Sequence, residues 1–293
     1  MRLCTFRSAD GPPEGWPGKV DGDRILRLDA PDLAAVLAHR GEVPSGAAFR
    51  AAHVELLTPV PRPPSVRDFF AFEQHIATAR ANRGSSVPAE WYEFPVFYFS
   101  NPTAIFGPDA EIPYPDGTAM LDYELEVAAI IGADGEIGGF TIMNDWSARD
   151  IQRKEMRVGL GPAKGKDFAT SLGPVVVTPD EFDCTRAVMT ARVNGEERSR
   201  GNLADIYYSW QAILAQAARN TVLRPGEIIG SGTVGTGCIL EHDDGRWLVP
   251  GDTVELEVAG IGVLRNRIGP PRATPGPGAT THGAGAPEAG GLR

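Results

Sequence analysis

The six residues from Asp122 to Val127 alternate carboxylic acids with bulky apolar side chains. This period of two is typical of a half-buried β-strand. Successive side chains on a strand point to opposite faces, so Asp122, Glu124 and Glu126 would share one face. Neighbouring negative charges repel one another unless water or a cation separates them. The segment leaves two interpretations open: a solvated face of an antiparallel strand, or a pocket wall that binds a hard divalent ion.

Composition argues against several classes of protein. The chain of 293 residues has a formal net charge of −10, and nucleic acids and anionic membranes both require a basic surface, so we expect neither as a partner. No apolar run approaches the ~20 residues of a membrane-spanning helix, and the N-terminus lacks the hydrophobic core of a signal peptide. The three cysteines form no CxxC pair, so neither a disulfide framework nor a thiolate zinc site is indicated. We expect a cytoplasmic protein.

Turn signals and composition divide the chain into three parts. Residues 1–58 are predicted to form a small N-terminal α/β module. The segment 59–64 contains four prolines and is predicted to be a linker. It opens a larger domain, residues 59–268, in which many short strands are mixed with a few scattered helices. Residues 269–293 are rich in Gly, Pro and Ala and are predicted to be a disordered tail. The whole is therefore predicted to be a β-rich α+β protein.

Periodicity predicts the individual elements. Hairpin turns are expected at Asp21-Gly22 and Asn194-Gly195. Residues 230–235 match the GxGxxG pattern, but the following residues 236–242 read as a strand, whereas a dinucleotide site requires a helix there. These glycines are instead expected to allow close backbone approach. Helices are predicted at residues 31–40, 65–83, 145–157 and 205–219, and strands at 3–6, 25–28, 96–99, 122–131, 175–177 and at several places between 228 and 263.

Polar residues elsewhere in the larger domain are candidates for catalysis. Asp145 and Arg149 are spaced i,i+4 at the start of a predicted helix, and Gln152 follows on the same face. His75 lies in the first predicted helix of this domain, and Glu241 ends an apolar segment. Each also has an ordinary explanation: a helix cap with a surface ion pair, a structural histidine, and a charge at the end of a strand.

Several segments together resemble the fumarylacetoacetate hydrolase family. The resemblance covers residues 60–268 in order, and it implies a mixed β-sandwich roll of the C-terminal domain type of that family, preceded by a small accessory module. It also implies a homodimer. The segments that carry it are Arg67–Phe70 with Gln74 and His75, Leu121–Val127, Met143–Gln152, Gly165–Pro174, Ser231–Thr233 and Gly260–Arg267.

The resemblance implies a bound divalent cation. The chemistry of an oxygen-only ligand set favours Mg²⁺, Ca²⁺ or Mn²⁺ over zinc. Lys166 and Thr170 match residues that line the same site. The implied ligands are Asp68, Glu124, Glu126 and Asp145.

The resemblance also implies a substrate-binding set, Arg149, Gln152, Tyr98 and Thr233. A further arginine is expected soon after the His75 helix, and either Arg80 or Arg83 fits that place. The loop 84–95, which contains Trp91 and Tyr92, is expected to act as a lid that selects the acyl group of the substrate.

The activity implied by the resemblance is hydrolysis of a carbon–carbon bond in a 1,3-diketone acid, such as fumarylacetoacetate or an acylpyruvate. His75, oriented by Glu241, would activate water, and a metal-stabilised enolate would leave. Lys166, with Arg149 or Gln152, would stabilise the oxyanion. Two alternatives stay open. One is metal-dependent decarboxylation or tautomerisation of a β-keto acid, and the other is a non-catalytic binding protein that the metal stabilises.

Overall fold

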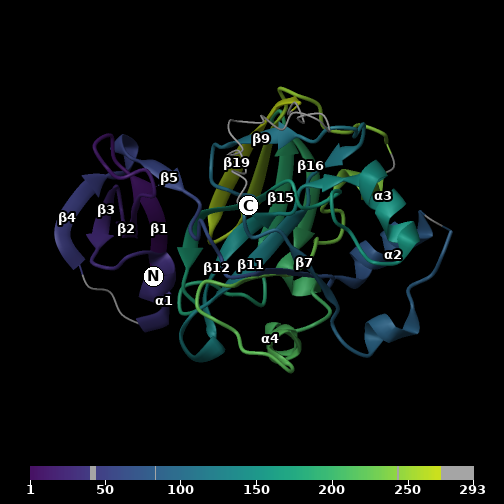
Figure 1. Ribbon diagram of the computed structural model, residues 1–293, viewed down its shortest axis with the longest axis horizontal. Coiled ribbons are helices and arrows are strands. Elements are labelled where there is room, and N and C mark those ends of the chain that lie inside the picture. The colour runs from purple at the N-terminus through teal and green to yellow at the C-terminus, as the bar shows by residue number, and fades with distance from the viewer. Residues whose placement is uncertain (40–43, 83, 243, 272–293) are drawn as a thin grey trace, which may run out of the picture.

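The computed structural model describes residues 1–39, 44–82, 84–242 and 244–271 (Figure 1). Within these ranges, strands far outnumber helices and form a sheet of twelve strands, a sheet of five strands and a separate pair. Most neighbouring strands are antiparallel, but three pairs are parallel. The predicted β-rich α+β fold with mixed sheets is confirmed.

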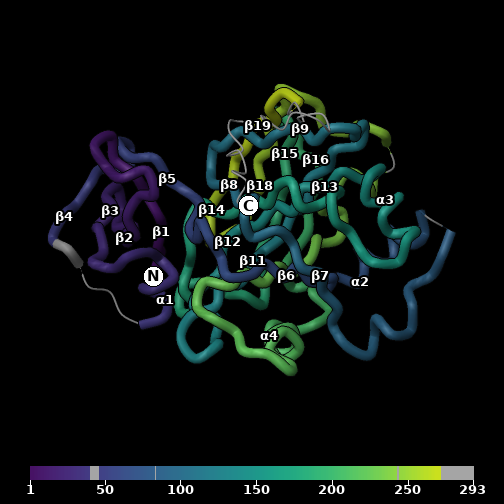
Figure 2. Tube along the Cα trace, viewed as in Figure 1, coloured from purple at the N-terminus to yellow at the C-terminus, as the bar shows by residue number. Residues whose placement is uncertain are grey.

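The chain path can be followed in Figure 2. The order of the larger sheet is β4 (Pro44–Arg50), β3 (Arg24–Leu28), β2 (Trp16–Asp21), β1 (Arg2–Arg7), β14 (Thr170–Val177), β12 (Ile137–Asn144), β11 (Leu125–Ile131), β17 (Ile228–Gly230), β6 (Val66–Phe69) and β7 (Phe97–Ser100), with β5 (Glu55–Leu57) on β1 and β8 (Ile105–Phe106) on β14. The smaller sheet has the order β16 (Glu196–Asn202), β15 (Val188–Val193), β18 (Thr253–Val258), β19 (Gly262–Pro271) and β9 (Glu111–Tyr114), and the separate pair is β10 (Leu121–Asp122) with β13 (Ser147–Ala148).

The central strands of the larger sheet are covered on both faces. The smaller sheet packs on β11, β12 and β14, and Val127 and Ala129 belong to the core on this side. Ala128 and Ile130 belong to a second core, which includes residues of α1 (Leu33–His39). All seven residues of β11 are therefore buried, as expected for a strand that has apolar neighbours on both sides.

The local turn signals are confirmed. The predicted hairpin at Asp21-Gly22 joins β2 to β3, and Asn194-Gly195 joins β15 to β16. Asn194 and Gly195 have φ angles of 52° and 82°, and this left-handed pair forms the tight turn that suits the twist of two antiparallel strands.

The two ends of the chain differ in part from the prediction. β1 pairs with β14, so the N-terminal strands continue the larger sheet (Figure 1), and the division at residue 58 stays a prediction. β19 runs to Pro271, so residues 269–271 are strand and the predicted tail would begin later. The remaining tail residues, 272–293, lie outside the described residues. No helix in the described ranges has the length and apolar character needed to cross a membrane.

The predicted helix at 65–83 is wrong in its first half. Val66–Phe69 forms β6, and the helix, α2, spans only Glu73–Ala81. All four residues of β6 are buried, because this strand pairs with β17 on one side and β7 on the other. Pairing with strands far away in sequence therefore overrides the local helical preference.

Two other predicted helices are shorter than expected. The helix predicted at 145–157 is α3 (Arg149–Val158), which follows β13, so Asp145 is not its N-cap. The helix predicted at 205–219 is α4 (Trp210–Ala218), whose start is fixed by Ser209, because its hydroxyl accepts a hydrogen bond from the Ala212 amide at 3.2 Å. Short 3₁₀ turns lie at Ala51–His53, Ala89–Tyr92, Ala133–Gly135 and Leu203–Asp205.

The segment after the GxGxxG match is not a strand. It contains the single helical turn α5 (Ile239–His242), so the predicted strand at 236–242 is wrong, and Glu241 is not a charge at the end of a strand. The expected role of the glycines is confirmed at Gly232. Its φ angle is +81°, and a Cβ there would lie 2.3 Å from the carbonyl oxygen of Phe69.

Candidate active site

Four carboxylates from distant parts of the chain converge. Asp68 lies on β6, Glu126 on β11, Glu124 just before β11, and Asp145 just after β12. One oxygen of each lies within 4.8 Å of an oxygen of each of the others. None of the four is more than 5% exposed. The exposed-strand interpretation of the acidic pattern is therefore wrong, and Glu124 and Glu126 face a buried cluster, here called the carboxylate cluster.

A glycine allows this close approach. Gly230 on β17 lies between β6 and β11, paired with Asp68 on one side and Ala128 on the other. A Cβ on Gly230 would lie 2.4 Å from Oδ1 of Asp68 and 3.0 Å from Oε2 of Glu126. Any larger residue there would push the two carboxylates away from each other.

The electrostatics of the carboxylate cluster are unfavourable without a cation. Burial, followed by the negative charges of the neighbouring acids, raises the pKa values of Asp68 and Glu126 well above the usual carboxyl range. Burial also raises the pKa of Asp145. Burial alone would raise the pKa of Glu124, but the positive charges of Arg149 and Lys166 hold it below its usual range. Most of the cluster thus resists carrying its negative charge.

The cluster fits a hard divalent cation. Oδ1 of Asp68 and Oδ1 of Asp145 are buried and have no hydrogen-bond partner among the described residues. Such unpartnered buried oxygens are costly unless an ion or ordered water satisfies them. A donor set made only of carboxylate oxygens suits Mg²⁺, Mn²⁺ or Ca²⁺.

Two cations, Lys166 and Arg149, lie beside the carboxylate cluster, and Nη2 of Arg149 is 2.7 Å from Oε1 of Glu124. Nζ of Lys166 lies 2.5 Å from Oε2 of Glu124 and 2.6 Å from Oδ2 of Asp145. Burial would lower the pKa of Lys166, but the charges of these two acids raise it. Lys166 therefore stays an ammonium, which has no lone pair to offer a metal, so it can line the cluster only as a charge. Thr170 is buried at the start of β14, and among the described residues its hydroxyl makes no hydrogen bond to the cluster.

Asp122 has a role that the sequence pattern does not reveal. The predicted strand at 122–131 is broken after Asp122, since β10 ends there and β11 begins at Leu125. Oδ2 of Asp122 accepts a hydrogen bond from Nε of Arg149 at 2.8 Å. Its two oxygens also accept the amides of Ile239 and Leu240 at 2.7 and 3.1 Å. Asp122 therefore holds Arg149 and the start of α5 together and is not part of the carboxylate cluster.

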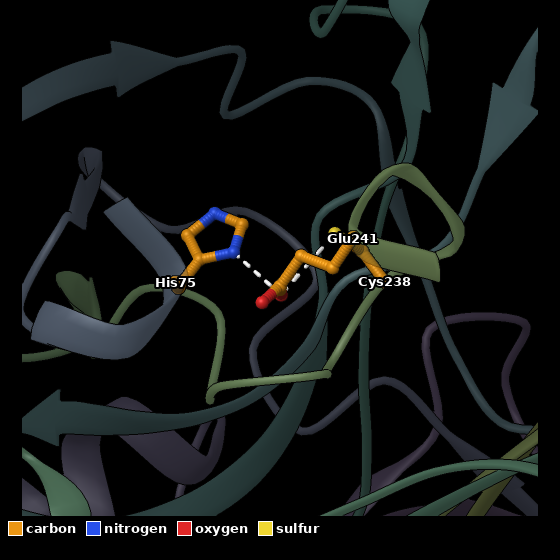
Figure 3. A group of neighbouring side chains, drawn as sticks. All are labelled: His75, Cys238 and Glu241. Carbon is orange, nitrogen blue, oxygen red and sulfur yellow. Dashed lines mark hydrogen bonds and ion pairs between the residues drawn. The ribbon is translucent and has the colours of Figure 1, made fainter. Parts of the chain in front are cut away.

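His75 and Glu241 form a buried pair at the side of this cluster. Nδ1 of His75, on α2, lies 2.7 Å from Oε1 of Glu241, on α5 (Figure 3). Glu241 also accepts the Thr236 amide at 3.0 Å. Burial would raise the pKa of Glu241, but the hydrogen bond and charge of His75 lower it below its usual range. An imidazole that donates Nδ1–H to a carboxylate keeps Nε2 as its basic nitrogen.

One pocket of about 280 Å³ opens onto this site, although Glu126, Asp145 and Glu241 are not among its lining residues. Arg80 also lines it, whereas Arg83 lies outside the described residues. Phe70, Val96 and Phe97 supply part of an apolar wall that sequence reasoning missed. The predicted site residues that line the pocket are Asp68, His75, Tyr98, Glu124, Arg149, Gln152, Lys166 and Thr233.

Three of the predicted substrate-binding side chains are already bonded to other site residues. The hydroxyl of Tyr98 donates to Oδ2 of Asp145 at 2.5 Å. The hydroxyl of Thr233 donates to Oε1 of Glu126 at 3.3 Å. Oε1 of Gln152 accepts from Nη1 of Arg149 at 3.2 Å. These contacts connect the pocket wall to the carboxylate cluster.

The expected lid residues do not line this pocket. Trp91 is 3% exposed, and its Nε1 donates to the carbonyl oxygen of Phe70 at 2.7 Å. Its ring packs against those of Tyr207 and Tyr208, with centroid separations of 4.9 and 5.5 Å. Trp91 therefore supports the loop that carries Phe70 and does not contact the pocket directly.

We expect the metal-free protein to become more stable as the pH falls from neutral toward the ordinary carboxyl range. The pKa values of Asp68, Glu126 and Asp145 are raised in the folded state. Their contribution to stability is therefore complete below the ordinary carboxyl pKa and is lost as the pH rises through the raised values. The contribution of Glu124, whose pKa is lowered, is lost only when the pH falls through that lowered value.

Urea unfolding in EDTA at about pH 5.5 and about pH 8 checks this expectation, because both lie above the ordinary carboxyl pKa of ~4. The control is the same measurement in saturating Mg²⁺. Protons then compete with the ion for the carboxylates, so the free energy of unfolding should instead increase with pH. A larger free energy of unfolding at the higher pH in EDTA would contradict the prediction.

Comparisons with known proteins agree with the fold and the site. The family model of the fumarylacetoacetate (FAA) hydrolase C-terminal domain matches residues 65–269. The oxaloacetate tautomerase YisK of Bacillus subtilis (strain 168) is 28% identical over 236 residues, which cover 75% of each chain.

Two solved structures are similar over 92% of this chain and the whole of theirs. One is a 5-carboxymethyl-2-hydroxymuconate delta-isomerase from Mycobacterium smegmatis, with a TM-score of 0.73 and 28% identity. The other is a fumarylacetoacetate hydrolase from the psychrophilic Exiguobacterium antarcticum, with a TM-score of 0.76 and 27% identity. The family model spans well over half of the chain, and the chain therefore belongs to the fumarylacetoacetate hydrolase family.

Proposed function

We propose that this protein is a divalent-metal-dependent enzyme that tautomerises or isomerises a β-keto acid of the oxaloacetate type. The reaction moves a proton between the carbon next to a carbonyl group and an oxygen or a second carbon. Two similar proteins, a tautomerase and an isomerase, support this choice by their names. It replaces hydrolysis as the favoured activity.

The observation that carries the choice is that the two buried cations beside the carboxylate cluster, Lys166 and Arg149, already donate to carboxylates. Cleavage by water would build up an oxyanion, which needs hydrogen-bond donors aimed at it. Lys166 donates to Glu124 and Asp145, and Arg149 donates to Asp122 and Glu124. Proton transfer passes through an enolate instead of a tetrahedral oxyanion, so it requires a base beside the substrate carbon and one positive charge at the carbonyl oxygen, which a metal held by the carboxylate cluster would supply.

His75 is the residue that we assign to move the proton. Its Nε2 would take the proton from the carbon and return it at the second position. Glu241, 2.7 Å from Nδ1, would hold the ring orientation and stabilise the imidazolium that forms. When held by the carboxylate cluster, a divalent ion such as Mg²⁺ would supply a Lewis acid that polarises the carbonyl oxygen.

The rest of the pocket would position the substrate. Arg80 lines the pocket and makes no ion pair among the described residues, so it is free to bind a substrate carboxylate. Gln152 and the apolar wall of Phe70, Val96 and Phe97 would fix the remainder of the molecule and exclude water from the reacting carbon.

Hydrolysis of a 1,3-diketone acid is the second candidate. The same pair of His75 and Glu241 could activate a water molecule, and one similar structure is a fumarylacetoacetate hydrolase. Decarboxylation of a β-keto acid would use the same ion but would release CO₂. The three reactions differ in their products, so they can be separated directly.

The experiment is a panel of oxaloacetate, acylpyruvates and fumarylacetoacetate, each with Mg²⁺, Mn²⁺ or EDTA. We expect accelerated interconversion of enol and keto oxaloacetate, followed by ultraviolet absorbance, with no loss of carbon and with inhibition by EDTA. Cleaved acids would favour the hydrolase, and CO₂ would favour the decarboxylase. Mg²⁺-dependent stabilisation without any turnover would support the non-catalytic alternative and overturn the proposal.

A further inference from the structure

We propose a second metal site, formed by His75, Cys238 and Glu241, that binds a thiophilic divalent ion such as Zn²⁺ and thereby inactivates the histidine. One ligand atom of each residue lies within 4.8 Å of the others. Figure 3 shows the imidazole ring and the sulfur on two sides of the same carboxylate group. The inhibitory consequence rests on the proposed function, whereas the site itself rests only on these three side chains.

The distances suit a shared ion. Oε1 of Glu241 lies 2.7 Å from Nδ1 of His75 and 3.6 Å from Sγ of Cys238. Zinc binds nitrogen at ~2.0 Å and sulfur at ~2.3 Å, so the ligand atoms of one tetrahedral ion lie roughly 3–4 Å apart. The separation between His75 and Glu241 would have to widen, and the third separation, from His75 to Cys238, is at most 4.8 Å.

The ligand chemistry differs from that of the carboxylate cluster. The cluster offers oxygen alone, whereas the second group offers one nitrogen, one sulfur and one carboxylate, a combination that favours zinc over magnesium. The sulfur of Cys238 is buried, and Glu241 is the partner of its hydrogen bond among the described residues. Cys4 and Cys184 belong to no such group in the described ranges.

The pocket provides the entry path. His75 and Leu240 line it, and Leu240 lies between Cys238 and Glu241 in the sequence. The pocket therefore reaches the imidazole and the residue between the other two ligands, and an ion can approach the site from this side. Three protein ligands would leave one coordination position for water, as in open zinc sites.

The proton balance shows why binding would inactivate the base. The thiol of Cys238 releases one proton to solvent and binds as a thiolate. The proton on Nδ1 of His75 moves to Nε2, so Nδ1 can bind the ion and the imidazole stays neutral. Nε2 then carries a hydrogen and can no longer accept a proton from substrate. No electron transfer is involved.

Cobalt absorption tests the site independently of activity. The full-length protein, with excess Mg²⁺ to fill the carboxylate cluster, is titrated with Co²⁺, and the thiolate-to-Co²⁺ charge-transfer absorption is recorded. We expect one equivalent of Co²⁺ to produce this absorption in the wild type. Cys238→Ser and Cys238→Ala should abolish it, while Cys184→Ser, the matched control at a partly buried cysteine, should keep it. Absence of the band in the wild type, or its persistence in both Cys238 variants, overturns the proposal.

Zinc inhibition tests the functional consequence. In excess Mg²⁺, the Zn²⁺ concentration for half-inhibition should rise at least ~10-fold in Cys238→Ser, with each variant measured against its own zinc-free rate. Equal inhibition of the variant and the wild type would place the effect at the carboxylate cluster and overturn the inhibitory role. A protein that shows the cobalt band but has no turnover on any β-keto acid would instead contradict the proposed function and leave the second metal site supported.

Discussion

Replacing His75 with glutamine is expected to lower kcat/KM for enol–keto interconversion by about 10²–10⁴-fold, the usual contribution of a general base. Glutamine can still donate a hydrogen bond to Glu241, which lies 2.7 Å from the ring nitrogen, but it cannot accept a proton at neutral pH. The loss should therefore appear in kcat and much less in KM. Initial rates at saturating Mg²⁺, with wild-type protein measured in parallel, give both constants.

Glu241→Gln is the matched second variant. It removes the negative charge beside His75 and keeps a similar shape, so we expect a smaller loss in kcat and a changed pH dependence. Neither variant removes a carboxylate from the cluster of Asp68, Glu124, Glu126 and Asp145, so both should keep the stabilisation by Mg²⁺. Wild-type kcat in His75→Gln would remove this residue from the mechanism.

Replacing Asp68 with asparagine is expected to abolish metal-dependent activity. The variant should be more stable than the wild type without the metal and less stable than the wild type with it. Oδ1 of Asp68 is buried without a partner, and burial and Asp145 raise its pKa. In EDTA, the variant should be more stable than the wild type by ~1 kcal/mol, because a poorly satisfied buried acid is gone. With Mg²⁺ at ~100 times its dissociation constant, the wild type should gain ~2.7 kcal/mol, and the variant should gain much less.

Thermal unfolding with and without Mg²⁺ measures these differences, since ~1 kcal/mol corresponds to ~2–4 °C in a domain of about 200 residues. Asp183→Asn is the control for the loss of one negative charge, because Asp183 forms a surface ion pair with Arg186 and lies outside the carboxylate cluster. A wild type that Mg²⁺ does not stabilise, or an Asp68 variant that keeps the full stabilisation, would show that the carboxylate cluster does not bind the ion.

Much of the site could be predicted from sequence because the residues that carry it lie in short, chemically specific segments. Asp68, Glu124, Glu126 and Asp145 were all named in this way, and the structure brings them together. The pairing of His75 with Glu241 was also predicted. The apolar wall around Phe70 was not, because no local pattern separates pocket-lining apolar residues from core residues.

Where backbone conformation depends on neighbours a few residues away, the sequence by itself determined the structure. The turn at Asn194-Gly195 needs only two residues that tolerate positive φ, so its position could be read directly. The overall β-rich composition likewise followed from many short apolar runs separated by turn residues. Local chemistry is sufficient in both cases.

Tertiary structure alone decided the conformation of segments whose partners are distant in sequence. Val66–Phe69 is a strand because β17, about 160 residues later, pairs with it. Asp122 stays outside the carboxylate cluster, and its carboxylate instead binds Arg149 and the amides at the start of α5. Glu241 on this turn of helix and Cys238 just before it lie beside His75. Hydrogen bonds and burial between distant segments outweigh local propensity at these places, and a single sequence does not show which distant segments will meet.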